Sequence, residues 1–368
     1  MKLLLLSDPN SVHTIKWAKS LANNGIDIII FGLGDFTVND YDTIENIKVI
    51  GFNEKITRVE GALEKLKYLK ALPKIKGIIK EFQPDILHSH YASSYGLLGA
   101  LSGFSPFILS VWGGDVFTYP HKSFIHKLAL EYTFKKADKI LSTSHIMAEE
   151  TKQYTNKEII VTPFGIDLDV FKPMKVITLF DKGDIVIGTV KTLEEKYGIE
   201  YLIKAFKIVS EEYPQLPLKL LIVGGGSLES ELQELTKNLH IDHKTIFVGR
   251  VPFVEIPKYH NMLSMSVSVS ISNCESFGVA IIEASACEKP VVVSDVGGLP
   301  EVVEDGVSGI VVAAKNENET AKAIGKLLDN KKLMIQMGKN GRRRVSKLYN
   351  WDDNVYQMID IYEKILEQ

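Results

Sequence analysis

The stretch ESFGVAIIEASACEKPVVVSDVGGLPEVVEDGVSGIVV, residues 275–312, carries most of the information about the fold. Its first part predicts a turn that contains Gly278, followed by a helix that begins between residues 277 and 279. Two apolar runs follow this helix, PVVVSDVGG at 290–298 and GIVVA at 309–313. Short apolar strands that alternate with helices are typical of a parallel sheet with both faces covered.

The same alternation extends through the rest of the chain. In the C-terminal half it continues with DIVIGTV (184–190), LKLLIVGG (218–225), TIFVGRV (245–251) and SVSVSIS (266–272). In the N-terminal half it comprises KLLLLS (2–7), IDIIIFG (26–32), DILHSH (85–90), FILSVWG (107–113), KILSTS (139–144) and EIIVTPFG (158–165). We therefore predict an α/β protein with two Rossmann-like, doubly wound parallel sheets in series.

Two domains are also expected from the length of 368 residues, which exceeds the size at which one hydrophobic core stops growing. The segment 165–184 breaks the alternation and contains Pro173, so we interpret it as the linker between the domains. The predicted N-terminal domain spans 1–165 and is completed by an amphipathic C-terminal helix at 351–368. The predicted C-terminal domain spans 166–350.

Composition excludes several classes of protein. A net charge of −3 gives no reason to expect nucleic-acid binding, and two cysteines, Cys274 and Cys287, cannot form a disulfide scaffold. The apolar run at the N-terminus is too short for a secretory signal, and no apolar stretch is long enough to span a bilayer. We expect a cytoplasmic protein, and contact with the inner face of the cell membrane is left open.

Two acidic residues flank the predicted start of the helix at 277–279. Glu275 lies just outside this helix and Glu283 lies about a turn and a half inside it. The free amides and dipole of a helix N-terminus favour a phosphate, and carboxylates beside a phosphate are explained if they bind sugar or ribose hydroxyls. The alternative is a helix-capping residue and an acid on a solvated face.

In full, the 275–312 stretch resembles the donor-site signature of the family 4 retaining glycosyltransferases. It has two glutamates eight positions apart, Phe-Gly after the first, and then Glu-Ala, Pro-Val-Val, Gly-Gly-x-x-Glu and Asp-Gly-x-x-Gly in order. FGIDLDVF (164–171) and VGGG (223–226) extend the resemblance over nearly the whole chain. It implies the GT-B fold, in which an acceptor-binding and a nucleotide-sugar-binding domain face a central cleft, as in bacterial surface-polysaccharide enzymes.

The resemblance also implies a role for each residue of the signature. Glu275 would bind hydroxyls of the transferred sugar, and Glu283 would bind the ribose. The residues after Glu275 are donor-binding positions, and the last three would contact the diphosphate through their backbone: Ser276, Phe277, Gly278 and Val279.

A second group of candidates follows the first strand of the C-terminal domain. Lys191 and Lys196 lie at its predicted carboxyl end, where two fixed cations would neutralise a departing nucleoside diphosphate. The family carries an arginine where Lys191 stands, and lysine keeps the charge but loses the planar fork. The alternative is a pair of surface lysines. With Glu275, they form the predicted catalytic set.

Two further donor contacts depend on the resemblance. Gly224 in VGGGS (223–227) would let the backbone approach the nucleotide, and Val251 would line the base with its backbone. Three glycines after a strand are by themselves a weak signal, and a tight strand-to-helix turn is the alternative.

The turn after the first strand, SDPNSVHT (7–14), departs from the family pattern. Asn10 and Ser11 stand where many relatives have a glycine pair, and we predict that they contact the donor. His13, which follows them, is a candidate substrate contact on the acceptor or sugar side. A helix-capping or solvated histidine is the alternative.

The stretch SVWGGDVF (110–117) holds two more candidates on the acceptor or sugar side. Trp112 stands where the family often has a histidine, and it would either stack on a sugar ring or pack into the wall of the site. Asp115 is the better polar candidate. His88 and His90 are expected to line the core or the site, because a metal centre needs more ligands than these two.

No metal or other cofactor is predicted. Asp167 and Asp169 match an acid-x-acid pattern that binds metal and diphosphate in another glycosyltransferase fold, but they lie in the predicted linker. We therefore interpret the pair as part of a turn.

The segment 55–80 is locally basic, with lysines interleaved among leucines and isoleucines. Such a segment could lie on an anionic membrane surface. The equally weighted alternative is an ordinary helix whose apolar stripe packs on the sheet.

The expected activity, implied by the resemblance, is a hexosyl transfer with retained configuration from a nucleoside-diphosphate sugar, with UDP as the expected nucleotide. The acceptor would be a glycan or a lipid-linked glycan in surface polysaccharide or glycolipid synthesis. A nucleotide-sugar epimerase of the same fold and a non-catalytic sugar-binding protein remain as alternatives.

Overall fold

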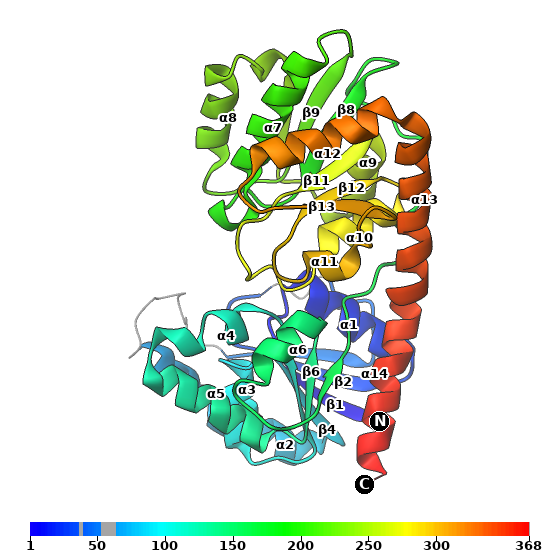
Figure 1. The fold of residues 1–368 in the computed structure, drawn as a ribbon. Coiled ribbons are helices and arrows are strands. Elements are labelled where there is room, and N and C mark those ends of the chain that lie inside the picture. Colours follow the sequence, from blue (N-terminus) through cyan, green and yellow to red (C-terminus); the bar gives the residue numbers. More distant parts are fainter. Residues whose placement is uncertain (37–39, 53–63, 368) are drawn as a thin grey trace. The chain divides into compact units, whose positions relative to one another are not determined.

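In the computed structural model, which describes residues 1–36, 40–52 and 64–367, the chain forms two compact units (Figure 1). Unit 1 comprises Met1–Pro163 together with Asp353–Gln368, and unit 2 comprises Phe164–Asp352. The division after Pro163 places the whole of the segment 165–184 in unit 2.

Unit 1 contains a seven-stranded sheet in which every pairing is parallel. The strands are β1 (Lys2–Leu6), β2 (Asp27–Gly32), β3 (Ile47–Gly51), β4 (Ile86–His90), β5 (Phe107–Val111), β6 (Lys139–Ser142) and β7 (Ile159–Val161). Their order across the sheet is β3-β2-β1-β4-β5-β6-β7. Six of these strands lie in predicted runs, and β3 is the strand that the sequence pattern did not predict.

Unit 2 contains a six-stranded parallel sheet that repeats this arrangement. Its strands are β8 (Ile185–Val190), β9 (Leu218–Val223), β10 (Thr245–Gly249), β11 (Met265–Ser268), β12 (Val291–Ser294) and β13 (Gly309–Val312), in the order β10-β9-β8-β11-β12-β13. The prediction of two doubly wound sheets is confirmed. The strand order reverses between β1 and β4 and between β8 and β11, and ligands bind beyond the carboxyl ends of the strands at such points.

Helices connect the strands in both units (Figure 1). In unit 1 these are α1 (Val12–Asn23), α2 (Leu72–Phe82), α3 (Tyr95–Ser102), α4 (Gly114–Phe117), α5 (Phe124–Lys136) and α6 (His145–Thr151). In unit 2 they are α7 (Ile199–Glu212), α8 (Glu229–Asn238), α9 (Ile256–Met262), α10 (Val279–Ala286), α11 (Leu299–Val302), α12 (Glu317–Asp329) and α13 (Lys331–Leu348). The chain ends with α14 (Trp351–Leu366), and short 3-10 turns are η1 (Glu64–Ala71), η2 (Pro120–Lys122), η3 (Glu195–Tyr197), η4 (Asp242–Lys244) and η5 (Phe253–Glu255).

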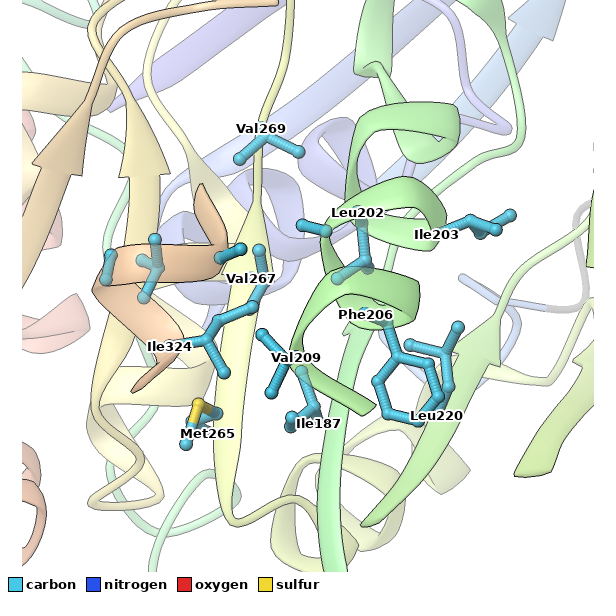
Figure 2. Packing of buried hydrophobic residues seen from close by; sticks show 14 of the residues in the cluster. Ile187, Leu202, Ile203, Phe206, Val209, Leu220, Met265, Val267, Val269 and Ile324 are labelled. Carbon is cyan, nitrogen blue, oxygen red and sulfur yellow. The ribbon is translucent and has the colours of Figure 1, made fainter. Parts of the chain in front are cut away.

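The core of unit 2 forms where α7 packs on the sheet (Figure 2). Leu202 and Phe206 of α7 are fully buried together with Ile187 of β8, Leu220 of β9 and Val267 of β11. Burying a side chain of this size contributes about 1.5–3 kcal/mol to folding. This packing holds β8 and β11 side by side, so the residues that follow these two strands meet at one edge of the sheet.

The segment 165–184, predicted as the linker, is grouped with unit 2. The amides of Asp169 and Val170 donate to Asp167 Oδ1 at 2.9 and 3.1 Å, which is the predicted turn. Asn261 of α9 then binds the Met174 amide at 2.9 Å and the Lys172 carbonyl at 3.0 Å. These hydrogen bonds attach the backbone of the segment to α9 of unit 2.

Helix α14 packs on unit 1 through its residues from Asp353 onward. Tyr362 is fully buried, and its Oη lies 2.7 Å from His88 Nδ1 on β4. Asn354 donates to the Pro163 carbonyl at 2.7 Å. The C-terminal helix is therefore tied to the sheet of unit 1 by buried polar contacts as well as by apolar packing.

Candidate functional site

The edge of unit 2 beyond β8 and β11 holds an ion pair between two predicted catalytic residues. Lys191 follows β8, and Glu275 lies in the loop between β11 and α10. Lys191 Nζ is 2.8 Å from Glu275 Oε2, and their side chains are only 14% and 11% exposed. Ser270 Oγ donates weakly to the same oxygen at 3.4 Å. The two charges neutralise each other in a partly desolvated site, where charge-assisted hydrogen bonds are strong.

Tyr197 organises the cations at this edge. Its ring lies 4.4 Å from Lys191 Nζ and 4.8 Å from Lys196 Nζ, measured to the ring centroid, and both are within cation–π range. The amide of Ile271 donates to the Lys196 carbonyl at 2.9 Å, which fixes the loop after β8 against the loop after β11. We call Lys191, Lys196, Tyr197 and Glu275 the lysine–glutamate cluster.

The loop after β9 supports this cluster through a glycine. Gly224 has φ +139°, and a Cβ atom there would collide with the carbonyl oxygen of Lys191. Glu194 accepts hydrogen bonds from the Ser227 amide at 3.0 Å and from Ser227 Oγ at 2.6 Å, and these two bonds lower the pKa of Glu194. The Val251 side chain packs in an apolar cluster of unit 2, so its backbone is the part that can line a base.

The start of α10 agrees with the predicted position, since the helix begins at Val279. Gly278 precedes it with φ +99°, and a Cβ atom there would lie 2.9 Å from Leu299 Cδ2. The ring of Phe277 is buried against Phe164 and Tyr349, at centroid distances of 6.0 and 5.2 Å. Phe277 can therefore meet a ligand only through its backbone.

Glu283 has a buried partner that the sequence did not reveal. Its Oε2 lies 3.2 Å from Nε2 of His260 on α9, and because a carboxylate only accepts, the imidazole donates. The His260 side chain is fully buried and that of Glu283 is 8% exposed. Among the described residues, His260 Nδ1 has no hydrogen-bond partner. The hydrogen bond from the buried His260 holds the Glu283 side chain in position.

In unit 1, a pocket of about 550 Å³ lies beyond β1 and β4. Predicted residues Asn10, Ser11 and Trp112 are brought together here. The lining is rich in hydroxyl and aromatic groups and consists of Ser7, Asp8, Asn10, Ser11, Leu33, Gly34, Asp35, Tyr68, His90, Tyr91, Ser94, Tyr95 and Trp112.

The turn after β1 is held by side chains in place of the glycine pair of relatives. The Asn10 amide donates to Asp8 Oδ1 at 3.0 Å, and Asn10 Nδ2 donates to the Asp35 carbonyl at 2.8 Å. The Ser11 amide donates to the Asp8 carbonyl at 3.1 Å, and Ser11 is the N-cap residue of α1. Both predicted residues line the pocket, within a hydrogen-bonded turn.

Trp112 packs between two histidines while it lines the pocket. Its ring centroid is 4.2 Å from that of His90 and 5.9 Å from that of His13. His90 Nδ1 is 3.0 Å from Ser7 Oγ. Burial lowers the pKa of His90 well below its ordinary value, and burial with the nearby Lys16 lowers the pKa of His13 to about 4. The aromatic wall of the pocket is therefore uncharged near neutral pH.

His88 and His90 separate into different roles, although both are buried. His88 Nδ1 contacts Tyr362 Oη and its Nε2 lies 2.8 Å from Ser110 Oγ, so it belongs to the core. Burial lowers the pKa of His88 to about 3. Within the described ranges, no three His, Cys, Asp or Glu side chains are grouped as a metal site would require.

Asp115, predicted on the acceptor or sugar side, has its carboxylate paired with backbone amides. The residue is fully buried, and its oxygens accept from the amides of Ala92 and Gly113 at 2.8 Å each and of Trp112 at 3.2 Å. Burial raises its pKa while these amides oppose the rise. Asp115 instead fixes the loop that presents Trp112.

The basic segment predicted at 55–80 is described only from residue 64 onward. Its helix α2 buries Ile75 and Ile78 in the core of unit 1, and Lys74 Nζ donates to the Gly51 carbonyl at 2.6 Å. The apolar stripe of α2 therefore packs on the sheet, which was the alternative to membrane contact. In the part of the chain that the structure describes, no helix is both long and apolar enough to cross a membrane.

Comparisons with known proteins agree with this architecture. The family model described as "Glycosyl transferases group 1" matches residues 171–344, and that described as "Glycosyl transferase 4-like" matches residues 2–144. An uncharacterized glycosyltransferase of Methanocaldococcus jannaschii is 28% identical over 294 residues, which cover 79% of this chain and 78% of that protein.

Solved structures show the same fold over the full length. Sucrose-phosphate synthase from Thermosynechococcus elongatus superposes with a TM-score of 0.84 at 21% identity, over 100% of this chain and 99% of that chain. Anabaena HepE, solved in complex with UDP and glucose, gives 0.79 at 19% identity over 99% of both chains. The chain thus belongs to the group 1 glycosyltransferases, with a family 4-like N-terminal part and the GT-B class of fold.

Proposed function

We propose that this enzyme transfers a hexosyl group from a nucleoside-diphosphate sugar to a hydroxyl of a glycan or lipid-linked glycan, with retention of configuration. The observation that carries the proposal is the lysine–glutamate cluster at the edge of unit 2 beyond β8 and β11. It combines two cations, which suit a diphosphate, with one carboxylate, which suits sugar hydroxyls.

The ion pair between Lys191 and Glu275 suits both groups to exchange partners when a donor binds. Lys191 would turn from the carboxylate to the diphosphate, and Glu275 would accept hydrogen bonds from the transferred sugar. Their side chains are largely buried, where an unpaired charge is costly, and in this exchange each group would keep a partner. Lys196, which is exposed, would provide the second cation.

The remaining donor contacts in this proposal also lie in unit 2. The backbone at Ser276, Phe277, Gly278 and Val279 leads into the N-terminus of α10, which favours a phosphate. Glu283, held by His260, would bind the ribose. Gly224 and the Val251 backbone would line the nucleotide.

The chemical step needs no nucleophilic side chain in this proposal. The bond between the anomeric carbon and the diphosphate oxygen breaks, and a bond from the acceptor oxygen to that carbon forms on the same face. The acceptor proton passes to the departing phosphate oxygen. Lys191 and Lys196 stabilise the negative charge that develops there, which is the charge that a metal would otherwise neutralise.

The unit 1 pocket is the proposed acceptor site. Its hydroxyl groups, two carboxylates and uncharged aromatic wall suit a polyhydroxyl ligand, with Trp112 offering a face to a sugar ring. Surface polysaccharide or glycolipid synthesis is the setting that we propose for this reaction.

UDP is the first nucleotide to test, because HepE of the same fold was solved with UDP and glucose. A panel of UDP-, GDP- and ADP-sugars should be scored by thermal stabilisation and by release of nucleoside diphosphate with a mixed glycan acceptor. We expect one donor to stabilise the protein and to be consumed only with acceptor present. Conversion of a donor to its isomer without acceptor would contradict the proposal, as would no response to any donor.

A further inference from the structure

Helix α5 of unit 1 carries large apolar side chains on its outward face. Four of its residues are exposed: Phe124 by 72%, Ile125 by 76%, Leu128 by 47% and Tyr132 by 37%. At about 100° per residue these four positions fall within one stripe of roughly 100° along the helix. We call these four residues the α5 face.

The opposite side of α5 is buried in the core of unit 1. Leu130 and Phe134 are fully buried in the core of unit 1, and Ser123 caps the start of the helix by accepting from the His126 amide. The helix is therefore fixed in place by apolar packing on its inner side. Its outer apolar residues are not needed for that packing, and exposed apolar surface of this kind marks an interaction site.

Lysines outnumber acidic residues in the segment 122–138, which contains the α5 face. Lys122, Lys127, Lys135 and Lys136 are exposed on or beside it, and Glu131, the one acid within α5, pairs with Lys127 at 3.8 Å. This basic surface belongs to a chain whose net charge is −3. Lys136 Nζ also lies 5.9 Å from the Tyr132 ring centroid, so an aromatic ring and a cation stand together at the boundary of the patch.

We propose that the α5 face docks on an anionic lipid surface, with the helix lying parallel to the membrane. Phenylalanine, leucine and isoleucine would enter the boundary between headgroups and acyl chains, while the lysines contact lipid phosphates. A second copy of this chain fits the face less well, because it would bring the same lysines together. The proposal places membrane contact on α5 and not on the 55–80 segment. Helix α2 of that segment buries its apolar stripe in the core.

The inference does not rest on the proposed reaction, and vesicle sedimentation tests it directly. The full chain is mixed with vesicles of phosphatidylcholine containing one-third phosphatidylglycerol, or of phosphatidylcholine alone, at low and at high salt. We expect binding to the anionic vesicles, at least tenfold weaker binding to neutral ones, and weakening by salt.

Two variants separate the parts of the contact. The pair Phe124→Ser and Ile125→Ser removes apolar area, and the pair Lys135→Glu and Lys136→Glu reverses charge; each should weaken binding at least tenfold. The matched control is Lys76→Glu with Lys80→Glu, the same change at two exposed lysines of α2. It should change binding less than threefold. Far-ultraviolet circular dichroism and thermal melting verify that each variant is folded.

Three results would overturn the proposal. The first is no binding to anionic vesicles, or equal binding to both kinds. The second is loss of binding in the α2 control with the α5 variants unchanged. The third is a concentration-dependent dimer in sedimentation equilibrium that the Phe124→Ser, Ile125→Ser pair converts to monomer, which would identify a second copy as the occupant.

Discussion

The two units use the same strand order but build different chemistry where that order reverses. Beyond β8 and β11, unit 2 places a lysine–glutamate ion pair beside a tyrosine ring. Beyond β1 and β4, unit 1 places a pocket walled by Trp112 and neutral His90. Topology decides where a ligand site forms, and the few residues after each strand decide whether it attracts charge or offers hydroxyl and aromatic contacts.

The two sites also hold their loops in different ways. In unit 2, Gly224 lets one loop pass directly against the Lys191 carbonyl. In unit 1, the Asn10 side chain bridges to the Asp35 carbonyl, and Asp115 gathers the amides around Trp112. The first device depends on the lack of a side chain and the second on the presence of one. The four predictions below challenge this contrast in turn.

The largest expected effect is on turnover, at the charged site. Glu275→Ala should lower the rate of sugar transfer by about 1,000-fold, since it removes a preorganised acceptor and leaves Lys191 unpaired. Ser270→Ala, which removes only the weak 3.4 Å bond to the same carboxylate, should lower it less than tenfold. Initial rates of nucleoside diphosphate release measure both. Near wild-type turnover of the Glu275 variant would show that Glu275 takes no part in sugar transfer.

The next effect is on stability. Gly224→Ala should destabilise unit 2 by about 3 kcal/mol, because a Cβ atom at φ +139° is strained and would collide with the Lys191 carbonyl. Asn10→Ala in unit 1 should cost about 1 kcal/mol, since it removes one exposed hydrogen bond. Hydrogen exchange, measured on individual peptides, reports the stability of each unit separately. Equal losses from the two substitutions would mean that the loops are held alike.

The third effect is a loss of the stability of unit 1 at acid pH. Burial lowers the pKa of His88 to about 3, that of His13 to about 4 and that of His90 well below its ordinary value. Below about pH 6.5 the unfolded chain binds protons that the folded unit does not, so stability falls as pH falls. For these three histidines the loss is about 2 kcal/mol between pH 7 and pH 6.

The measurement is hydrogen exchange of unit 1 peptides at several pH values. His90→Gln, which cannot titrate, should reduce the slope by about a third relative to the native chain. A flat stability of unit 1 between pH 7 and pH 5 would show that these histidines are not buried in their neutral form.

Long apolar runs made most of the fold predictable. All strands of unit 2 and six of unit 1 lie in such runs, because a strand buried on both faces has little room for polar residues. The edge strand β3, IKVIG, was not predicted, because it is short, only half-buried and interrupted by Lys48 at its second position. Helix α5 gave no signal either, since its apolar residues occupy both faces and show no period.

The site was predictable to the extent that its residues lie close together along the chain. Glu275 and the start of α10 belong to one continuous stretch, so their spacing could be read directly. The partner of Glu283, His260, depends on a contact between two separate helices, and no local pattern marks it. The full burial of Asp115 could not be predicted for a related reason, because other elements decide which carboxylate stays exposed.

The smallest predicted effect tests whether His260 acts through Glu283. If the imidazole fixes the carboxylate for the ribose, His260→Phe should raise the KM for the donor about fivefold, while kcat and the KM for the acceptor stay within twofold. His260→Gln keeps an N–H donor and should restore most of the donor affinity. A purely structural role predicts instead that both variants lower kcat and stability together and leave the donor KM unchanged. Because the expected shift is only about 1 kcal/mol, donor titrations at saturating acceptor are needed to separate the two outcomes.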